Sequence, residues 1–600
     1  MREISVPANY VPSGEENATD DVFRNAVDEP DRVGFSRQVG GHWVPVTYGE
    51  VAGQVIELAA GLIAAGVQAG ERVALMSHTR FEWMLFDFAI WTAGGVTVPV
   101  YETSSAEQVE WILADSGAVA ALVETEDHAN TVAQVRVGLP ELREVWVIDA
   151  GGIEELVVAG RDAPAERVTE RRRALTSDAL ATIIYTSGTT GLPKGCAITH
   201  GNLVAYVRNV CAVPGVRELV FTEQTKTLLF LPLAHILARA IQLCAVHNRV
   251  HLAHTADIKN LVPQLVEFRP TTVLSVPRVF EKVYNTAKHK AAVEGKSRIF
   301  AMADATAMAY SQSLDTGGPG QLLRIRHAFL GRLVYSKLRA ALGGQVTWAV
   351  SGGAPLGDRL NHFFRGIGLT VLEGYGLTET CAAMTLNLPA AQRIGTVGRP
   401  IPGCAVRIAD DGEVLCKGGN VFQGYWRNDE ATHEVIDDDG WFHTGDLGKL
   451  DVEGYLTITG RKKDLIVTSS GKNVAPAVLE DRLRAHWLVS QCVVVGDLRP
   501  FIGALITVDT DVFQQWKLEA GKTAEATVAD LHEDPDLLAA LQEAVDDANK
   551  AVSAAESIRK IRVLANDFTE ETGDLTPTLK VKRNIVLETF ADEVEALYRR

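Results

Sequence analysis

The chain has 600 residues, a formal net charge of −18 at pH 7, 46% hydrophobic residues and 22% charged residues. A chain of this length exceeds what one hydrophobic core usually organises, so we expect two or more domains. The composition is that of a folded globular protein. The acidic balance argues against sequence-independent binding to nucleic acid, which needs a basic surface to displace counterions.

The N-terminal segment and the cysteines favour a cytoplasmic protein. The sequence "MREISVPANY" carries Arg2 and Glu3 with no apolar run behind them, which argues against a signal peptide. We expect no transmembrane helix, because no run of about 18 apolar residues appears, although peripheral contact with the inner membrane surface stays open. Seven scattered cysteines without a C-x-x-C spacing predict reduced, buried thiols rather than disulfides or a zinc site.

Short apolar runs alternate with helical patterns near the start of the chain. The runs at 72–76 and 96–100 predict buried strands, and the stretch at about 80–94 between them predicts an amphipathic helix. A second helix is expected after Ser104, which stands three residues before Glu107, as in a capping box. This βαβ order predicts mostly parallel, buried sheets.

The segment "YTSGTTGLPKG" at 185–195 follows an apolar strand and combines glycines, hydroxyls and one lysine. The N–H groups of such a loop can bind phosphate oxygens, and Lys194 would add positive charge. The P-loop of motor proteins and GTPases does not fit. Pro193 has no N–H to donate, and Gly195 stands where that loop has a magnesium-binding hydroxyl. The loop therefore indicates phosphate binding by another class of protein.

The second half of the chain changes character twice. A helical region at about 285–342, interrupted at 315–320, is expected on the surface. From about 394, glycine turns between short strands predict a β-meander or small barrel. Past a polar cluster at 460–466, helices and strands predict a compact second domain. We therefore expect an N-terminal domain at 1–459, a hinge at 460–466 and a C-terminal domain at 467–600.

Six further segments come after the glycine-rich loop. They are "LPLAHI" (231–236), "SGGAPL" (351–356), "EGYGLTET" (373–380), "GWFHTGD" (440–446), "GRKKDLI" (460–466) and "LTPTLKVKR" (575–583). Together with the loop, they resemble the motifs of the adenylate-forming superfamily of acyl-CoA synthetases, luciferase and peptide-synthetase adenylation domains. The resemblance runs from about residue 40 to 590. It implies a large α/β N-terminal domain of layered parallel sheets with a small β-barrel-like subdomain, and a small, mobile α+β C-terminal domain.

The resemblance also implies a nucleotide site. The residues that would bind ATP or AMP are Thr186, Ser187, Gly188, Thr189, Thr190, Gly191, Lys194, Gly353, Ala354, Pro355, Glu373, Gly374, Tyr375, Gly376, Thr378, Asp446, Arg461 and Lys463. Tyr375 would stack on adenine, and the carboxylate of Asp446 suits a ribose diol because it can accept from both hydroxyls. Glu379 and Thr186 would hold Mg²⁺ between the phosphates, since hard oxygen ligands suit a hard cation.

The catalytic residues implied by the resemblance are Lys580, Lys194, Glu379 and Thr186. Lys580 would contact the carboxylate and the α-phosphate as charge moves to pyrophosphate; Lys582 is the competing assignment. His235, with Gly353 and Gly471, would border the acyl and pantetheine channel, but a core histidine is the alternative at that position.

The implied reaction has two halves and uses ATP, Mg²⁺ and CoA. A carboxylate attacks the α-phosphorus to give acyl-AMP and pyrophosphate. The C-terminal domain then rotates about Lys463, removes Lys580 and brings the face at 469–473 to the site, where a thiol displaces AMP. Segments 257–284 and 575–583 resemble the long-chain fatty acid branch.

Three alternatives to this function stay open. A fatty acyl-AMP ligase would not use CoA, but such enzymes carry an insertion after the hinge that this sequence lacks. A non-catalytic scaffold would bind acyl-AMP without turnover, and a kinase would release ADP rather than AMP. A homodimer is compatible with the sequence, and the acyl chain preference is not encoded in any motif that we recognise.

Overall fold

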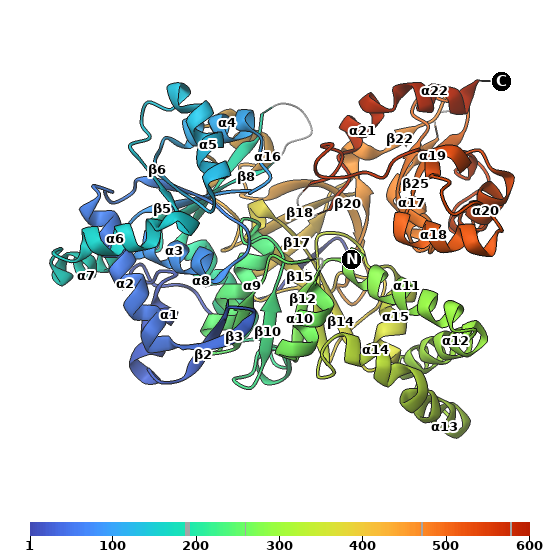
Figure 1. The fold of residues 1–600 in the computed structure, drawn as a ribbon, viewed down its shortest axis with the longest axis horizontal. Coiled ribbons are helices and arrows are strands. Elements are labelled where there is room, and N and C mark those ends of the chain that lie inside the picture. Colours follow the sequence, from blue (N-terminus) through green and yellow to red (C-terminus); the bar gives the residue numbers. More distant parts are fainter. Residues whose placement is uncertain (187–191, 259, 470–471, 577–578, 600) are drawn as a thin grey trace.

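The computed structural model describes residues 1–600 apart from 187–191, 259, 470–471, 577–578 and 600. Figure 1 shows most of the N-terminal sheets and helices on the left, helices α11–α14 at the lower right and the C-terminal elements at the upper right. Two hydrophobic clusters contain only residues from 466 onward, and two others contain only residues up to 458. This division of the core agrees with separate N-terminal and C-terminal units.

The largest sheet has seven strands and carries the glycine-rich loop. Its order is β19 (Gly424–Tyr425), β9 (Lys194–Thr199), β8 (Leu180–Thr186), β5 (Val96–Val100), β4 (Arg72–Met76), β6 (Ala118–Val123) and β7 (Glu144–Val147). The strands from β8 to β7 are parallel, whereas β9 and β19 pair antiparallel at one edge. The prediction of mostly parallel strands is confirmed here.

Helices cover both faces of this sheet. They are α2 (Tyr48–Ala64), α3 (Phe81–Thr92), α4 (Ala106–Ser116), α5 (Glu126–Gln134), α6 (Gly152–Gly160), α7 (Ala165–Arg173) and α8 (His200–Cys211). Alternate residues of β4 point to opposite faces, so Val73 and Leu75 pack in the cluster of α2 and α3, while Ala74 and Met76 pack in that of α4 and α5. A parallel sheet covered on both faces explains the unbroken apolar strands.

Two predictions about these helices are wrong in detail. Helix α3 is not amphipathic: every residue except Glu82 is buried, because the helix lies between the sheet, α2 and α7. The capping box of α4 is formed by Ser105 and Gln108, one residue later than the predicted pair of Ser104 and Glu107. Both errors arise because sequence spacing does not fix where a helix begins or what covers its polar face.

Two further sheets complete the layered part of the N-terminal unit. One has the order β10 (Lys226–Leu229), β11 (His251–His254), β2 (Val33–Val39) and β3 (His42–Thr47). The other has the order β12 (Thr272–Ser275), β13 (Trp348–Ser351), β14 (Thr370–Leu377), β15 (Ala382–Leu386) and β16 (Arg399–Pro400), with the first three strands parallel. Helices α1 (Asp20–Asp28), α9 (Ile236–His247), α10 (Leu261–Phe268) and α15 (Asp358–Gly366) belong to the same unit.

The expected surface helices and small β subdomain are both present. The helices are α11 (Pro277–Val293), α12 (Ser297–Leu314), α13 (Gln321–Leu330) and α14 (Ser336–Ala341), and a π-helical turn, η4 (Gly331–Tyr335), joins the last two. The subdomain is an antiparallel sheet of β1 (Glu3–Ser5), β17 (Cys404–Ile408), β18 (Glu413–Gly418), β20 (Phe442–Leu450) and β21 (Leu456–Arg461). Its edge strand β1 comes from the N-terminus, which the sequence pattern did not indicate.

The C-terminal unit is a compact α+β arrangement. Its strands are β22 (Ile466–Val467), β23 (Asn473–Val474), β24 (Val489–Val495), β25 (Ile502–Val508) and β26 (Ile558–Val563), and its longer helices are α17 (Pro476–Arg484), α18 (Thr510–Glu519), α20 (Pro535–Asn549), α21 (Arg583–Thr589) and α22 (Ala591–Tyr598). Proline at the first position of α17 and α20 favours helix initiation, since that position needs no N–H donor. None of the described helices is long and apolar enough to cross a bilayer.

A charged pair lies in the core between the largest sheet and α9. Asp87 and Arg239 are both fully buried. The Arg239 Nε donates to an Asp87 carboxylate oxygen at 2.7 Å, and the Thr97 hydroxyl donates to the other oxygen at 2.8 Å. The rings of Trp83 and Trp91 lie 5.4 and 5.0 Å from the guanidinium carbon. Every partner needed to compensate two buried charges is therefore present.

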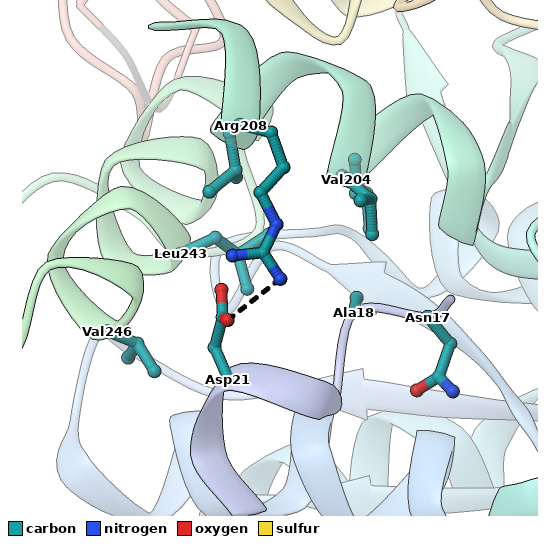
Figure 2. Close-up of a pocket in the computed structure, with 9 residues that line it drawn as sticks. Asn17, Ala18, Asp21, Val204, Arg208, Leu243 and Val246 are labelled. Carbon is teal, nitrogen blue, oxygen red and sulfur yellow. Dashed lines mark ion pairs between the residues drawn. The ribbon is translucent and has the colours of Figure 1, made fainter. Parts of the chain in front are cut away.

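A small cavity lies between α1, α8 and α9, as Figure 2 shows. Its volume is about 20 Å³, room for about one water molecule. An ion pair of 3.1 Å between Asp21 and Arg208 stands at its side. The cavity is too small for a substrate, so it belongs to the packing of the three helices and not to a binding site.

Candidate active site

The predicted motifs meet where three sheets approach one another. Strands β13 and β14 are parallel with Ser351 opposite Glu373, so the segments that follow them lie side by side. This is the edge at which α/β sheets bind ligands. In the β subdomain, Asp446 on β20 lies opposite Arg461 on β21. The largest sheet contributes Thr186, at the end of β8.

Asp446 is held by two partners within this site. The Tyr375 hydroxyl donates to its Oδ2 at 2.7 Å, and the Arg461 Nε lies 3.0 Å from its Oδ1. Burial and the charge of Asp446 raise the pKa of Tyr375 well above its usual value, so the phenol stays protonated and can donate. The two residues that the sequence assigned to adenine and ribose are therefore in direct contact.

Beside this group lies an open cavity of about 300 Å³, lined by Thr444, Gly445, Arg461, Lys462 and Lys463. Three of its five lining residues carry positive charge, in a chain whose net charge is −18. A cavity of this volume can hold a small polar ligand, and its cationic lining suits an anionic one.

Glu379 occupies the centre of the predicted metal site. Its Oε1 accepts a hydrogen bond of 3.0 Å from the Tyr425 hydroxyl, and its backbone oxygen accepts from the Phe422 N–H at 2.8 Å. The Lys194 amine lies 5.2 Å from the centre of the Tyr425 ring. Lys194, Tyr425 and Glu379 therefore form one chain of contacts next to the glycine-rich loop.

Thr186 and Glu379 approach each other around Cys196. The Thr186 hydroxyl lies 4.0 Å from the Cys196 sulfur. Burial and the charge of Glu379 raise the pKa of the Cys196 thiol well above its usual value, so the cysteine is a neutral spacer between them. A hydroxyl and a carboxylate provide hard oxygen ligands, and Mg²⁺ commonly takes its other ligands from water and phosphate. The donor set therefore fits the predicted ion.

Glu373 bonds to the protein on both sides of its carboxylate. Its carboxylate accepts from the Leu356 N–H at 2.9 Å and from the Asn361 amide at 2.8 Å, so both oxygens bond to protein. These bonds fix the end of the 351–356 segment behind the site. Gly353, Ala354 and Pro355 in that segment are exposed. The structure gives Glu373 a positioning role, and its contact with nucleotide stays a prediction.

Gly374, Gly376 and Thr378 lie in the β14–β15 hairpin and the turn after it. A Cβ atom at Gly376 would come within 1.7 Å of the Ala382 carbonyl oxygen, and one at Gly374 would lie 3.0 Å from the Thr385 oxygen. The close approach of the strands therefore requires glycine at 376 and leaves little room for a side chain at 374. Thr378 is buried.

Lys580 reaches the site from the C-terminal unit. A Cβ atom built on Gly353, which has a φ of +86°, would lie 3.6 Å from the Lys580 Cε. The backbone of Lys580 bonds to Thr576: its N–H donates to the Thr576 hydroxyl at 3.0 Å, and its carbonyl accepts from the Thr576 N–H at 2.8 Å.

The surroundings of the Lys580 amine lower its pKa. The residue as a whole is exposed to solvent, but protein atoms crowd its amine. Loss of water and the charge of Arg461 lower the pKa of Lys580 to about 8, against the opposing effect of Asp446. The competing Lys582 donates its backbone N–H to the Asp574 oxygen. Burial and the charge of Glu102 raise the pKa of Glu570, against the opposing effect of Lys582.

His235 caps helix α9 at the edge of the same site. Its Nδ1 accepts from the Leu237 N–H at 3.1 Å, which places the ring proton on Nε2. Burial and the charge of Lys580 lower the pKa of His235 to about 3, so the imidazole is neutral. His235 thus has a structural bond and also lies within electrostatic reach of Lys580. Its place beside the acyl and pantetheine channel stays a prediction.

The polar cluster at 460–466 contacts the β subdomain. The Lys462 amine lies 2.5 Å from Asp411 and 3.1 Å from Glu413. Lys463 is within electrostatic reach of Asp446. Loss of water and the charge of Arg461 lower its pKa, against the opposing effect of nearby carboxylates. Residues 460–466 therefore connect the nucleotide-side carboxylate to the start of the C-terminal unit.

Several predicted residues cannot be placed, and some contacts were not predicted. Ser187, Gly188, Thr189, Thr190, Gly191 and Gly471 lie outside the described residues. Tyr425 was missed, as was the bond of 2.8 Å from the Trp111 indole to the Pro193 oxygen. Only the pairing of β19 with β9 brings Tyr425 to the loop, and nothing in the short sequence "GYW" at 424–426 indicates that pairing.

The family can be decided from comparisons with known proteins. A family model described as AMP-binding enzyme matches residues 22–426, and one described as AMP-binding enzyme C-terminal domain matches residues 463–600. The chain belongs to the AMP-binding enzyme family. This AMP-binding enzyme is 56% identical to the long-chain-fatty-acid–CoA ligase FadD15 of Mycobacterium bovis and 55% identical to that of Mycobacterium tuberculosis, over 100% of each chain.

More distant relatives agree with this family, and solved structures agree with its fold. Long-chain-fatty-acid–CoA ligase ACSBG2 of Xenopus laevis is 30% identical over 96% of this AMP-binding enzyme and 83% of its own length. The anthranilate CoA ligase AuaEII, solved with anthranoyl-AMP, has a TM-score of 0.73 at 20% identity, covering 98% and 99% of the two chains. The A domain of a Segniliparus rugosus carboxylic acid reductase, solved with AMP, has a TM-score of 0.74 at 20% identity over 97% and 94%. The predicted fold class is confirmed.

Proposed function

We propose that this AMP-binding enzyme activates a long-chain fatty acid with ATP to acyl-AMP and pyrophosphate, and then transfers the acyl group to CoA with release of AMP. The observation that carries this proposal is the convergence of Lys580, Gly353 and His235, with Lys580 also in electrostatic reach of Asp446. A cationic amine from the C-terminal unit at this position would face the nucleotide. The relatives at 55–56% identity support the choice of substrate.

The residues of the chain suit the first half-reaction. Asp446 would accept the ribose hydroxyls, because its carboxylate is fixed by Tyr375 and Arg461. The amine of Lys580 would lie between the fatty acid carboxylate and the α-phosphate and stabilise the charge that develops there. Lys194 would neutralise the phosphates that leave as pyrophosphate. Neutral His235 adds no charge beside the acyl carboxylate.

Mg²⁺ would be held by Glu379 and Thr186. When bound, it would neutralise phosphate charge and align the leaving pyrophosphate. The Tyr425 hydroxyl donates to the Glu379 Oε1 and would orient the carboxylate that holds the ion. The described residues contain no cluster of three or more acidic, histidine or cysteine ligands. The metal would therefore depend on the bound nucleotide for most of its ligands.

The second half-reaction would follow rotation of the C-terminal unit about Lys463. Lys580 lies next to Gly353 in the structure, and acyl-AMP formation would use this arrangement. Rotation would withdraw Lys580 and bring the segment around 469–473, including Gly471, toward the pantetheine arm of CoA. The thiol of CoA would then displace AMP.

Two alternatives remain to be separated from this proposal. A fatty acyl-AMP ligase would stop at the adenylate. It is disfavoured because only nine residues of sequence, 467–475, separate the hinge from α17, which begins at Pro476. A non-catalytic scaffold is disfavoured because Lys194, Glu379, Asp446 and Lys580 are all retained.

The test is product analysis with ATP, Mg²⁺, CoA and saturated fatty acids of increasing length. We expect AMP and acyl-CoA in equal amounts, highest with long chains, and no ADP. Release of pyrophosphate with accumulation of acyl-AMP, but no AMP and no thioester, would identify a fatty acyl-AMP ligase. No turnover with any acid would identify a scaffold. Preference for short or aromatic acids would refute the long-chain assignment. The Lys580→Ala variant supplies the background rate.

We also propose where the enzyme acts. Long-chain fatty acids partition into lipid, so an enzyme in the cytoplasm that consumes them would work at the inner membrane surface. A homodimer stays a prediction. Cell fractionation at low and high salt would test the membrane location, and light scattering would test the homodimer.

A further inference from the structure

Helix α13 exposes a row of large apolar side chains. Leu322, Ile325 and Phe329 are 81%, 69% and 64% exposed, and Leu333 in the following turn η4 is 42% exposed. Spacings of three and four residues place the three α13 side chains on one helical face. We call Leu322, Ile325, Phe329 and Leu333 the α13 face.

The opposite side of the helix is firmly packed. Leu330 and Tyr335 are fully buried. The His327 ring stacks on the Tyr310 ring at 3.8 Å between centres, and its Nε2 lies 2.6 Å from the Gly366 oxygen. Figure 1 shows α12 and α13 projecting from the lower right of the molecule. The α13 face is therefore a fixed, outward surface.

The charges around the α13 face are positive. Residues 296–339 contain seven Lys and Arg but two Asp, in a chain whose net charge is −18. Both aspartates form ion pairs with arginines outside this segment. Arg324, Arg326 and Arg332 are exposed and form no ion pair with any carboxylate in the described part of the chain. The α13 face is therefore an apolar row with unneutralised arginines at its sides.

We infer that the α13 face docks on the surface of an anionic lipid bilayer. An amphipathic helix with apolar residues on one face and arginines beside it binds in the plane of a membrane, with the apolar side chains among the acyl chains and the cations at the headgroups. A second copy of the chain is disfavoured as the occupant, because contact through this face would bring two cationic segments together. The inference deepens the proposed membrane contact and rests on it.

The test is binding of the full chain to vesicles of phosphatidylglycerol and phosphatidylcholine, measured by co-sedimentation. We expect the wild type to bind phosphatidylglycerol vesicles at least tenfold more tightly than pure phosphatidylcholine vesicles. The variant Ile325→Glu/Phe329→Glu should lose at least tenfold in affinity. The matched control is Val137→Glu/Leu518→Glu, which alters two residues that are 100% and 73% exposed elsewhere and should bind as the wild type does.

A second variant tests the charges without altering the apolar row. Arg326→Glu/Arg332→Glu should lose the preference for phosphatidylglycerol, as should the wild type in high salt. Circular dichroism confirms that each variant is folded. Equal binding by the wild type and the Ile325→Glu/Phe329→Glu variant would overturn the inference. So would a wild-type dimer that this variant converts to a monomer, since the face would then be a subunit interface.

Acyl-CoA formation from dissolved decanoate, without vesicles, separates this inference from the proposed function. All of these variants should turn over decanoate at the wild-type rate, whatever that rate is, because none of the altered residues lies in the site. Normal turnover with no vesicle binding would overturn the docking inference alone. Vesicle binding with no turnover of any acid would overturn the proposed function alone.

Discussion

The charge of Lys580 should depend on pH within the usual working range of an enzyme. Its amine has a pKa of about 8 because protein atoms and Arg461 disfavour the protonated form. A lowered pKa means that the amine is charged below pH 8 and neutral above it. For the free enzyme, kcat/KM for ATP in acyl-AMP formation should be constant below about pH 8 and fall about tenfold per unit well above it. Pyrophosphate release with saturating fatty acid measures this.

The control for this prediction is Lys580→Arg. A guanidinium stays protonated throughout the range, so the fall above pH 8 should disappear even if the maximum rate is lower. Lys580→Ala should lose about two to three orders of magnitude in the same half-reaction. A fall at pH 8 that persists in Lys580→Arg would show that another group titrates.

Some residues of the site could be predicted from the sequence, and others could not. Asp446, Tyr375 and Lys580 could be named, because their motifs are long and occur in a fixed order. Tyr425 could not, since its role depends on the pairing of β19 with β9, residues far apart in the chain. Glu373 could be named but not given its role, because its bonds to Leu356 and Asn361 exist only in the folded chain.

Among the elements, α3 and α9 are joined by the buried pair of Asp87 and Arg239. Removing one member leaves an uncompensated buried charge, so Asp87→Ala should lower the free energy of unfolding by about 3–5 kcal/mol. Replacing both charged residues, as in Asp87→Leu/Arg239→Met, should lower the free energy of unfolding by much less. Urea unfolding followed by tryptophan fluorescence measures both, because Trp83 and Trp91 lie against Arg239. Similar losses in the single and double variants would contradict this account.

The elements themselves were predicted better than their boundaries and surroundings. The strand and helix order of the first half is visible in the sequence, since apolar runs and helical periods are local. The burial of α3 on every side and the addition of β1 to the sheet of β17 depend on contacts with distant segments. Local patterns contain no information about such contacts, so the capping residue of α4 and the partner of β1 appear only in the structure.

For the whole molecule, the arrangement of the two units is held in part by Arg278 on α11. Its guanidinium lies 3.0 Å from the Ser490 hydroxyl and 3.5 Å from an Asp509 oxygen, both in the C-terminal unit. This contact accompanies the placement of Lys580 in the site. Arg278→Ala should therefore slow acyl-AMP formation several-fold and leave thioester formation from supplied acyl-AMP unchanged.

The matched control for Arg278→Ala is Arg324→Ala, which removes an exposed arginine that makes no contact with the C-terminal unit among the interactions described. It should leave both half-reactions unchanged. If Arg278→Ala slowed the two half-reactions equally, the contact would stabilise the fold and not one arrangement of the units.

The proposed rotation about Lys463 gives a second prediction at this scale. Proline fixes φ and so restricts the rotation of the backbone at that position. Lys463→Pro should leave acyl-AMP formation far less impaired than thioester formation, because only the second step needs the rotated arrangement. The two half-reactions are measured separately, by pyrophosphate release and by acyl-CoA formation from supplied acyl-AMP. Equal losses would refute the hinge.

All seven cysteines of the chain are buried and unpaired. A maleimide dye reacts with an exposed thiolate and should leave these residues unlabelled in the folded protein. One new cysteine on each unit, at the exposed positions Val137 and Leu518, would therefore accept a donor and an acceptor dye without removal of any native cysteine. The distance between the two units could then be followed by energy transfer through a single turnover.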